Sequence, residues 1–217
     1  MPNLPNKPLL LIDAASPRVF VGLWKGGGWL ACATPERPAL ESIFSGVEQL
    51  FYDAKLGLAD VGGFVHCEGP GSILGVRLSA MAIRTWRAFP TWARVPVWSF
   101  GSLHFAAAAY GAENGSPPPN LISEFRHGRW NLLLAGEDTV MAVDDVVLND
   151  LQEPLVYLRQ RKTWQSAPSH AVEWSPDWRN CAHLVETPSL LRPVHEPDVF
   201  IAEEAVFQKW SAERHRG

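Results

Sequence analysis

The order of hydrophobic patterns along residues 1–112 is the feature that most constrains the fold of this chain. Short apolar, strand-type runs come first, at 9–13, 18–24 and 29–34, and a glycine turn joins the last two. Helix-type periodicity then alternates with strand-type runs as far as residue 111. Three strands followed by alternating helices and strands predict an α/β fold, with a mixed sheet and helices on its faces.

Three helices are expected in this half. The first covers 38–57, where Gly57 provides a stop, the second runs from about Ser72 to Ala88, and the third covers 101–111. The apolar side chains of the first helix lie on one face, which is wide enough to cover the sheet and also to meet another chain. That face consists of Leu40, Ile43, Phe44, Val47, Leu50, Phe51 and Ala54.

A linker divides the chain. The stretch GAENGSPPPN, at 111–120, combines Gly, Ser, Asn and Pro. We therefore expect a first subdomain at 1–112 and a reduced second subdomain at 113–217. The second half has strand-type runs, a Trp- and Pro-rich segment with weak periodicity and a short final helix, which we place at 121–125, 129–136, 139–148, 154–159, 164–197 and 202–210.

The composition restricts the cellular location and the kinds of partner that we expect for this chain. The net charge of −4 argues against a protein that binds nucleic acid alone through a basic surface. The three cysteines, Cys32, Cys67 and Cys181, are far apart and odd in number, which indicates a reducing, cytoplasmic setting rather than a disulfide framework. Neither a targeting segment nor a run of transmembrane length is visible, so no membrane association is expected.

The stretch GPGSILGVRLS, at 69–79, has two interpretations. A glycine loop that opens a helix can bind a phosphate through backbone N–H groups. However, no Lys-Ser/Thr pair follows Gly75, and the glycine spacing is not G-x-G-x-x-G. We favour a tight turn that lays the helix closely against the rest of the protein. Asp13, at the end of the first strand, is a turn residue in one interpretation. The other interpretation comes from the resemblance of this element order to the ribonuclease H-like halves of the actin-like superfamily, which implies an aspartate that approaches a metal and a phosphate.

No catalytic residue, metal site or cofactor is predicted. The histidines are scattered without H-x-x-x-H or H-E-x-x-H spacing, and no G-x-S-x-G elbow occurs. Cys181 and His183 are two residues apart and are not expected to form a catalytic pair.

Small residues line one stripe of the second helix. Gly75, Ser79 and Ala82 stand at i, i+4 and i+7, with Ile83 and Trp86 beside them. Such a stripe permits close approach of either the chain's own sheet or a partner helix, and we favour the partner. Arg84 and Arg87, further along the helix, are expected at a solvated edge.

Four segments resemble the TsaB (YeaZ) family. GPGSILGVRLS is similar to its G-P-G-S-F-T-G-x-R-x-G segment, and LLLIDAAS resembles its opening I-D-T-S strand. PVWSFGSLHFAAAA and PDVFIAEEAVFQKW resemble its P-V-x-x-V-S-x-L-x-x-x-A and closing segments. The positions that agree with the family pattern are Asp13, Gly69, Pro70, Gly71, Ser72, Gly75 and Arg77. All of these except Gly75 would lie near a nucleotide.

The resemblance implies an actin-like, ribonuclease H-like fold with a complete first half and a reduced second half. Members do no chemistry alone and pair with the catalytic, metal-binding TsaD subunit and a TsaE-like ATPase. Together these proteins put a threonylcarbamoyl group on an adenosine of certain tRNAs, so this chain would meet tRNA only through the complex. Older descriptions name such proteins glycoprotease-like.

The chain departs from the family pattern at several positions. Ile73 and Leu74 replace Phe-Thr, and SEFR, with Glu124 and Arg126, replaces D-A-R. The usual histidine before the first long helix is missing from TPERPALES. These departures are typical of a divergent member.

We therefore expect a non-catalytic partner subunit that forms a homodimer when alone. The rival functions are a small-molecule kinase or ATPase of the same superfamily and, less favoured, a peptidase. The residues expected to contact a partner are Phe44, Val47, Phe51, Gly75, Ser79, Ala82, Ile83 and Trp86.

Overall fold

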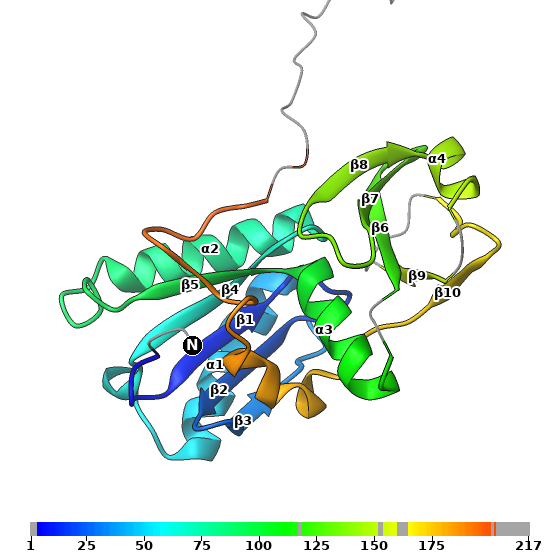
Figure 1. Ribbon diagram of the computed structural model, residues 1–217. Helices are drawn as coiled ribbons and strands as arrows, with labels where there is room; N and C mark the ends of the chain where they lie inside the picture. Colours follow the sequence, from blue (N-terminus) through cyan, green and yellow to red (C-terminus); the bar gives the residue numbers. More distant parts are fainter. Residues whose placement is uncertain (1–3, 117–118, 152–153, 160–164, 201, 203–217) are drawn as a thin grey trace, which may run out of the picture.

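Two mixed sheets stand side by side in the computed structural model, which describes residues 4–116, 119–151, 154–159, 165–200 and 202 (Figure 1). The first sheet has the order β11-β5-β4-β1-β2-β3. Its strands are β1 Leu9–Asp13, β2 Phe20–Lys25, β3 Gly28–Ala33, β4 Gly63–Gly69, β5 Val97–Gly101 and β11 Arg192–Val194. The second sheet has the order β10-β9-β6-β7-β8. Its strands are β6 Asn120–Arg126, β7 Arg129–Leu133, β8 Val140–Asp144, β9 Leu155–Leu158 and β10 Ala171–Glu173.

Strand β1 lies at the centre of the first sheet. The buried strand that its apolar run predicted is confirmed. All of its residues are buried, and it pairs antiparallel with β2 and parallel with β4. The β2–β3 hairpin closes through Gly26 and Gly27, whose φ angles of 59° and 84° lie in the left-handed region that glycine adopts without strain. The predicted three-strand meander and glycine hairpin are confirmed.

Helices α1 (Ala39–Ala54) and α2 (Ile73–Arg87) cover one face of this sheet (Figure 1). They bury Ile43, Leu50 and Ile83 against the strands in one apolar cluster. Both helices were predicted, but the stop of α1 was placed wrongly. The residue in the left-handed conformation at its end is Lys55, with φ 52°, and not Gly57.

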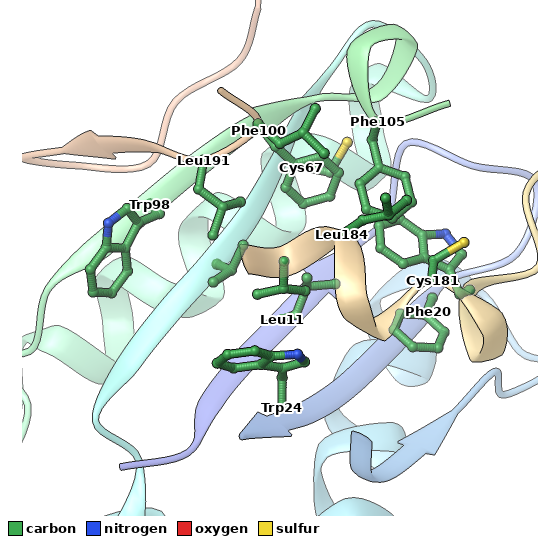
Figure 2. Close-up of a cluster of buried hydrophobic side chains, with 14 of the residues drawn as sticks. Leu11, Phe20, Trp24, Cys67, Trp98, Phe100, Phe105, Cys181, Leu184 and Leu191 are labelled. Atoms are coloured by element: carbon green, nitrogen blue, oxygen red, sulfur yellow. The ribbon is translucent and has the colours of Figure 1, made fainter. Parts of the chain in front are cut away.

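The opposite face is covered by α3 (Ser102–Asn114) and by two short 3-10 helices, η2 (Trp178–Asn180) and η3 (Ala182–Glu186). Figure 2 shows Cys181 and Leu184 from the short helical segment gathered with Phe20 and Phe105 in one apolar cluster. The first sheet is therefore the middle layer of an α/β/α sandwich.

Helix α3 also contacts the second sheet. Its Phe105 side packs on the first sheet, and its Leu103 side packs on Leu121, Leu133 and Val156 of the second. A helix with apolar side chains on both sides is expected where it is buried between two layers. Helix α4 (Asp145–Asn149) lies at the far end of the second sheet (Figure 1).

The Trp- and Pro-rich segment returns to the first half of the chain. Residues 178–191 join the core of the first sheet, and β11 pairs antiparallel with β5 at its edge. Helix α3 continues to Asn114, so a division between 112 and 113 falls within its last turn. The helix expected at 202–210 lies almost entirely outside the described residues. Within the described part of the chain, no helix is both long and apolar enough to cross a bilayer.

Candidate functional site

A cavity of about 420 Å³ lies between the two sheets. Its walls come from the turn after β1, the glycine loop after β4, the start of α3, the middle of β6, the end of β9, and residues 175–179. Of the residues expected near a nucleotide, Asp13, Pro70 and Gly71 line it. The other members of that set, Gly69, Ser72 and Arg77, are not among its lining residues, and Arg77 is exposed on α2.

The carboxylate of Asp13 is held by groups of the chain itself. Its Oδ1 accepts the backbone N–H of Ala15 at 2.9 Å. Its Oδ2 accepts the hydroxyl of Ser16 and the indole N–H of Trp178, the latter at 3.1 Å. Burial raises the pKa of Asp13, and the hydrogen bonds from Ser16, Ala15 and Cys67 oppose that shift without cancelling it. Donors of the protein thus occupy most of the lone-pair positions that a metal ion would need.

Trp178 donates to the Asp13 carboxylate, and the sequence did not predict this contact. Its ring stacks between Phe20, at a centroid distance of 4.9 Å, and Phe105, at 4.0 Å. Phe100 meets it edge-on at 5.6 Å. The only signal in the sequence was the high tryptophan content of 164–197, which does not tell one tryptophan from another.

The glycine loop makes the tight turn that the sequence favoured. The N–H of Ser72 donates to the carbonyl of Ala15 at 2.9 Å, and its side chain accepts the N–H of Gly75 at the start of α2. A Cβ at Gly75 would collide with the carbonyl oxygen of Ala14, and one at Gly71 with that of Ala15. The loop therefore packs closely on the turn after Asp13. One of its own N–H groups, that of Ser72, is used in this contact.

The small-residue stripe of α2 faces the chain's own sheet, so its assignment to a partner helix is wrong. Gly75, Ser79, Ala82 and Ile83 are all buried. Ser79 makes a 3.1 Å hydrogen bond with the Nδ1 of the buried His66 on β4. Small residues are needed here because α2 must approach the β1 turn and leave room for an imidazole.

Two further residues expected at an interface, Val47 and Trp86, are also buried within the chain. Phe51 is half-buried against the same cluster. Phe44 is 46% exposed, and its ring meets Trp86 edge-on at 5.9 Å. Apart from Tyr52, the exposed large apolar residues of these two helices, which we name the α1–α2 surface, are Leu40, Phe44, Ile73, Leu74 and Met81.

We expected the two arginines at the end of α2 to lie at a solvated edge. Instead, both donate hydrogen bonds to the segment that follows β11. Arg84 donates to the carbonyl of Pro197 at 2.7 Å, and Arg87 to that of His195 at 2.6 Å. The Nε2 of His66 lies 2.9 Å from the carbonyl oxygen of Asp198 in the same segment. Burial lowers the pKa of His66.

The remaining candidates do not join the cavity. Glu124 is buried in β6, where its Oε1 accepts the hydroxyl of Tyr157 at 2.6 Å, and the Arg126 guanidinium lies over the Phe125 ring. Cys181 donates to the backbone carbonyl of Asp177. In the part of the chain that the structure describes, no three His, Cys, Asp or Glu side chains form a metal-binding group.

Comparison with known proteins shows the fold. No protein-family model matches the chain, and no curated protein matches it in sequence. Solved structures do match. An uncharacterised protein with similarity to the peptidase YeaZ from Pseudomonas aeruginosa superposes with a TM-score of 0.57, at 17% identity over 70% of this chain and 74% of that one.

YeaZ from Pseudomonas aeruginosa superposes with a TM-score of 0.52, at 18% identity over 64% of this chain and 65% of its own. The fold is that of YeaZ. The resemblance to this family that the sequence motifs indicated is thereby confirmed in the structure. The region that superposes covers most of the chain.

Proposed function

We propose that this chain is a non-catalytic partner subunit of the complex that makes threonylcarbamoyladenosine in tRNA, and that it binds a TsaD-like catalytic subunit. The observation that carries the proposal is the YeaZ fold, together with the collinear motifs at LLLIDAAS and GPGSILGVRLS. In this proposal the fold is actin-like, with a complete first subdomain and a reduced second one. The protein acts in the cytoplasm, and a TsaE-like ATPase and the tRNA join through the complex.

The geometry around Asp13 supports a binding role over a kinase or ATPase role. Nucleotide chemistry needs a carboxylate free to meet a metal and backbone N–H groups free to meet phosphate. Here the Asp13 oxygens accept from Ala15, Ser16 and Trp178, and the N–H of Ser72 is used by Ala15. The same contacts favour an isolated chain that does not hydrolyse ATP. In this proposal the isolated chain cleaves no peptides either.

The α1–α2 surface is the proposed contact with the catalytic subunit. Its apolar side chains are exposed although they lie next to a well-packed core, and exposed apolar groups that gather on two neighbouring helices are typical of protein interfaces. Phe44 is the best anchor, because its aromatic ring is partly supported by Trp86 and partly free. In the absence of the catalytic subunit the same surface would hold two copies of this chain together.

The test is a calorimetric titration of the purified chain with a purified TsaD-type subunit. The variant Phe44→Glu should weaken binding at least about thirtyfold, since an anchor of this kind contributes about 2 kcal/mol or more. The matched control is Val172→Glu on β10, where the apolar side chain is 65% exposed on the other sheet. Both variants should keep the melting temperature of the native chain.

Binding of the TsaD-type subunit that survives Phe44→Glu would contradict the α1–α2 assignment. No binding by the native chain would contradict the partner role as a whole. Sedimentation of the chain alone gives the dimer expectation its own readout, because Phe44→Glu should shift any dimer to monomer and Val172→Glu should not.

A further inference from the structure

The segment that follows β11 runs alongside α2 (Figure 1). Arg87, the last residue of α2, donates to the carbonyl of His195 at 2.6 Å. Arg84, which stands earlier in the helix, donates to the carbonyl of Pro197 at 2.7 Å. As its residue numbers rise, the segment therefore moves from the end of α2 towards the start of this helix.

The next contact of this segment lies near the first turn of α2. The N–H of Phe200 donates to the carbonyl of Glu68 at 2.7 Å, and Glu68 precedes the last residue of β4. Only the loop 70–72 separates β4 from α2, so the described part of the chain ends near Ile73 and Leu74, which open the helix.

The exposed side of α2 carries an apolar patch with a cation in it. Ile73, Leu74 and Met81 are 56%, 67% and 61% exposed, and we name these three residues the α2 patch. Leu74 and Met81 stand at i and i+7 and share one face of the helix. Arg77 lies between them in sequence, is exposed, and makes no ion pair with any residue that the structure describes.

The sequence after the last described residue matches this patch in pattern and in charge. Val206, Phe207 and Trp210 stand at i, i+1 and i+4, so a helix there would carry all three on one face. Glu203 falls on the same face and has the opposite charge to Arg77. Apolar anchors at this spacing are how an amphipathic helix binds an apolar surface on another helix.

The patch and this sequence also match in length. From Ile73 to Met81, α2 advances about 12 Å at about 1.5 Å per residue. A helix over 203–211 would be about 14 Å long on the same scale. It is therefore long enough to cover the whole α2 patch.

We propose that residues 203–211 dock as an amphipathic helix on the α2 patch of the same chain, with Phe207 and Trp210 as its anchors. Because the α2 patch is part of the α1–α2 surface, the docked segment would exclude a catalytic subunit from that surface. The segment is then a self-inhibitory element, and this second step rests on the proposed function. The apparent affinity for the subunit is reduced by the fraction of chains in which the patch is open.

The docking is tested on the isolated full chain by oxidation with hydrogen peroxide, with methionine sulfoxide located by mass spectrometry. Met81 should oxidise at least about threefold more slowly in the native chain than in Trp210→Glu, because only the open fraction exposes its thioether. Met141, 40% exposed on β8, is the internal control and should oxidise at one rate in every chain. Gln208→Glu adds the same charge on the opposite face of the segment and should leave Met81 protected.

Equal oxidation rates of Met81 in the native chain and in Trp210→Glu would overturn the docking. Phe207→Glu provides a second variant and should expose Met81 as Trp210→Glu does. Protection of Met81 that disappears when the protein is diluted tenfold would also overturn the proposal, because the cover would then come from a second copy of the chain.

The self-inhibition is tested by calorimetric titration with a purified TsaD-type subunit. Trp210→Glu should bind the subunit about fivefold to tenfold more tightly than the native chain does, and Gln208→Glu should bind it with the native affinity. Equal affinities for all three chains would overturn the self-inhibition. Absence of binding by every chain would contradict the proposed function instead, and the oxidation rates, which need no second protein, would still decide the docking.

Discussion

Replacement of Trp178 is the sharpest test of how the C-terminal segment supports the first sheet. The side chain is 7% exposed, stacks on two rings and donates to the buried carboxylate of Asp13. Truncation of a buried tryptophan to alanine costs about 3–5 kcal/mol of unfolding free energy, and we expect Trp178→Ala to cost about 4 kcal/mol. Trp178→Phe keeps most of the stacking and loses the hydrogen bond, so we expect it to cost about 2 kcal/mol.

The assay is urea unfolding at a fixed pH, with circular dichroism as the signal. Trp174→Ala is the matched control. Trp174 is half-buried and has one edge-on contact, with Tyr110 at 5.2 Å, so its truncation should cost about 1–2 kcal/mol. A loss of unfolding free energy below about 1.5 kcal/mol for Trp178→Ala would refute the argument, since Trp178 would then not anchor the C-terminal segment to the first sheet. Equal losses for the Phe and Ala variants would refute the assignment of a separate stacking contribution.

Two other predictions follow from buried titratable groups. Burial holds the pKa of His66 below 6.5, with Asp198 opposing this shift and Arg84 adding to it, so on acidification the unfolded chain takes up the proton first. The unfolding free energy should therefore fall as the pH drops below about 6.5, and His66→Gln should flatten this dependence. Urea titrations that give the native chain and His66→Gln the same loss of unfolding free energy between pH 7.5 and 5.0 would contradict it. Burial also raises the pKa of the Cys181 thiol to about 11 and that of Cys67 well above its usual value, so both stay protonated at pH 8. Ellman's reagent should label only the half-buried Cys32 before urea is added, and rapid labelling of Cys67, located by mass spectrometry, would show that this part of the core opens.

Much of the first sheet and its helices could be predicted because each element has a local signal. The run LLLID is apolar throughout, as a buried central strand requires, and Ser72 is a standard N-cap followed by periodic apolar residues. The direction of the α2 stripe could not be predicted. Small residues permit close packing but do not say against what, and the partner of Ser79 is an imidazole on a strand before it in sequence.

The candidate site was harder to predict than the fold. Asp13, Pro70 and Gly71 were predicted site residues, and they line the cavity. However, Trp178, whose indole N–H donates to the Asp13 carboxylate, lies 165 residues further along the chain. A contact that spans so much sequence leaves no spacing pattern. The segment that supplies it is built from 3-10 turns and a short strand, which show no period to recognise.

The late return of residues 178–194 has a consequence for synthesis on the ribosome. The Asp13–Trp178 hydrogen bond joins residues 165 positions apart, and at about 5–20 residues per second its second partner emerges about 8–33 s after the first. During that interval the Phe20 and Phe105 rings lack their intervening indole, and β5 lacks its neighbour β11. A nascent chain of this protein therefore presents an aromatic surface and an open strand edge, features that favour aggregation and chaperone binding, until residues 178–194 have been made.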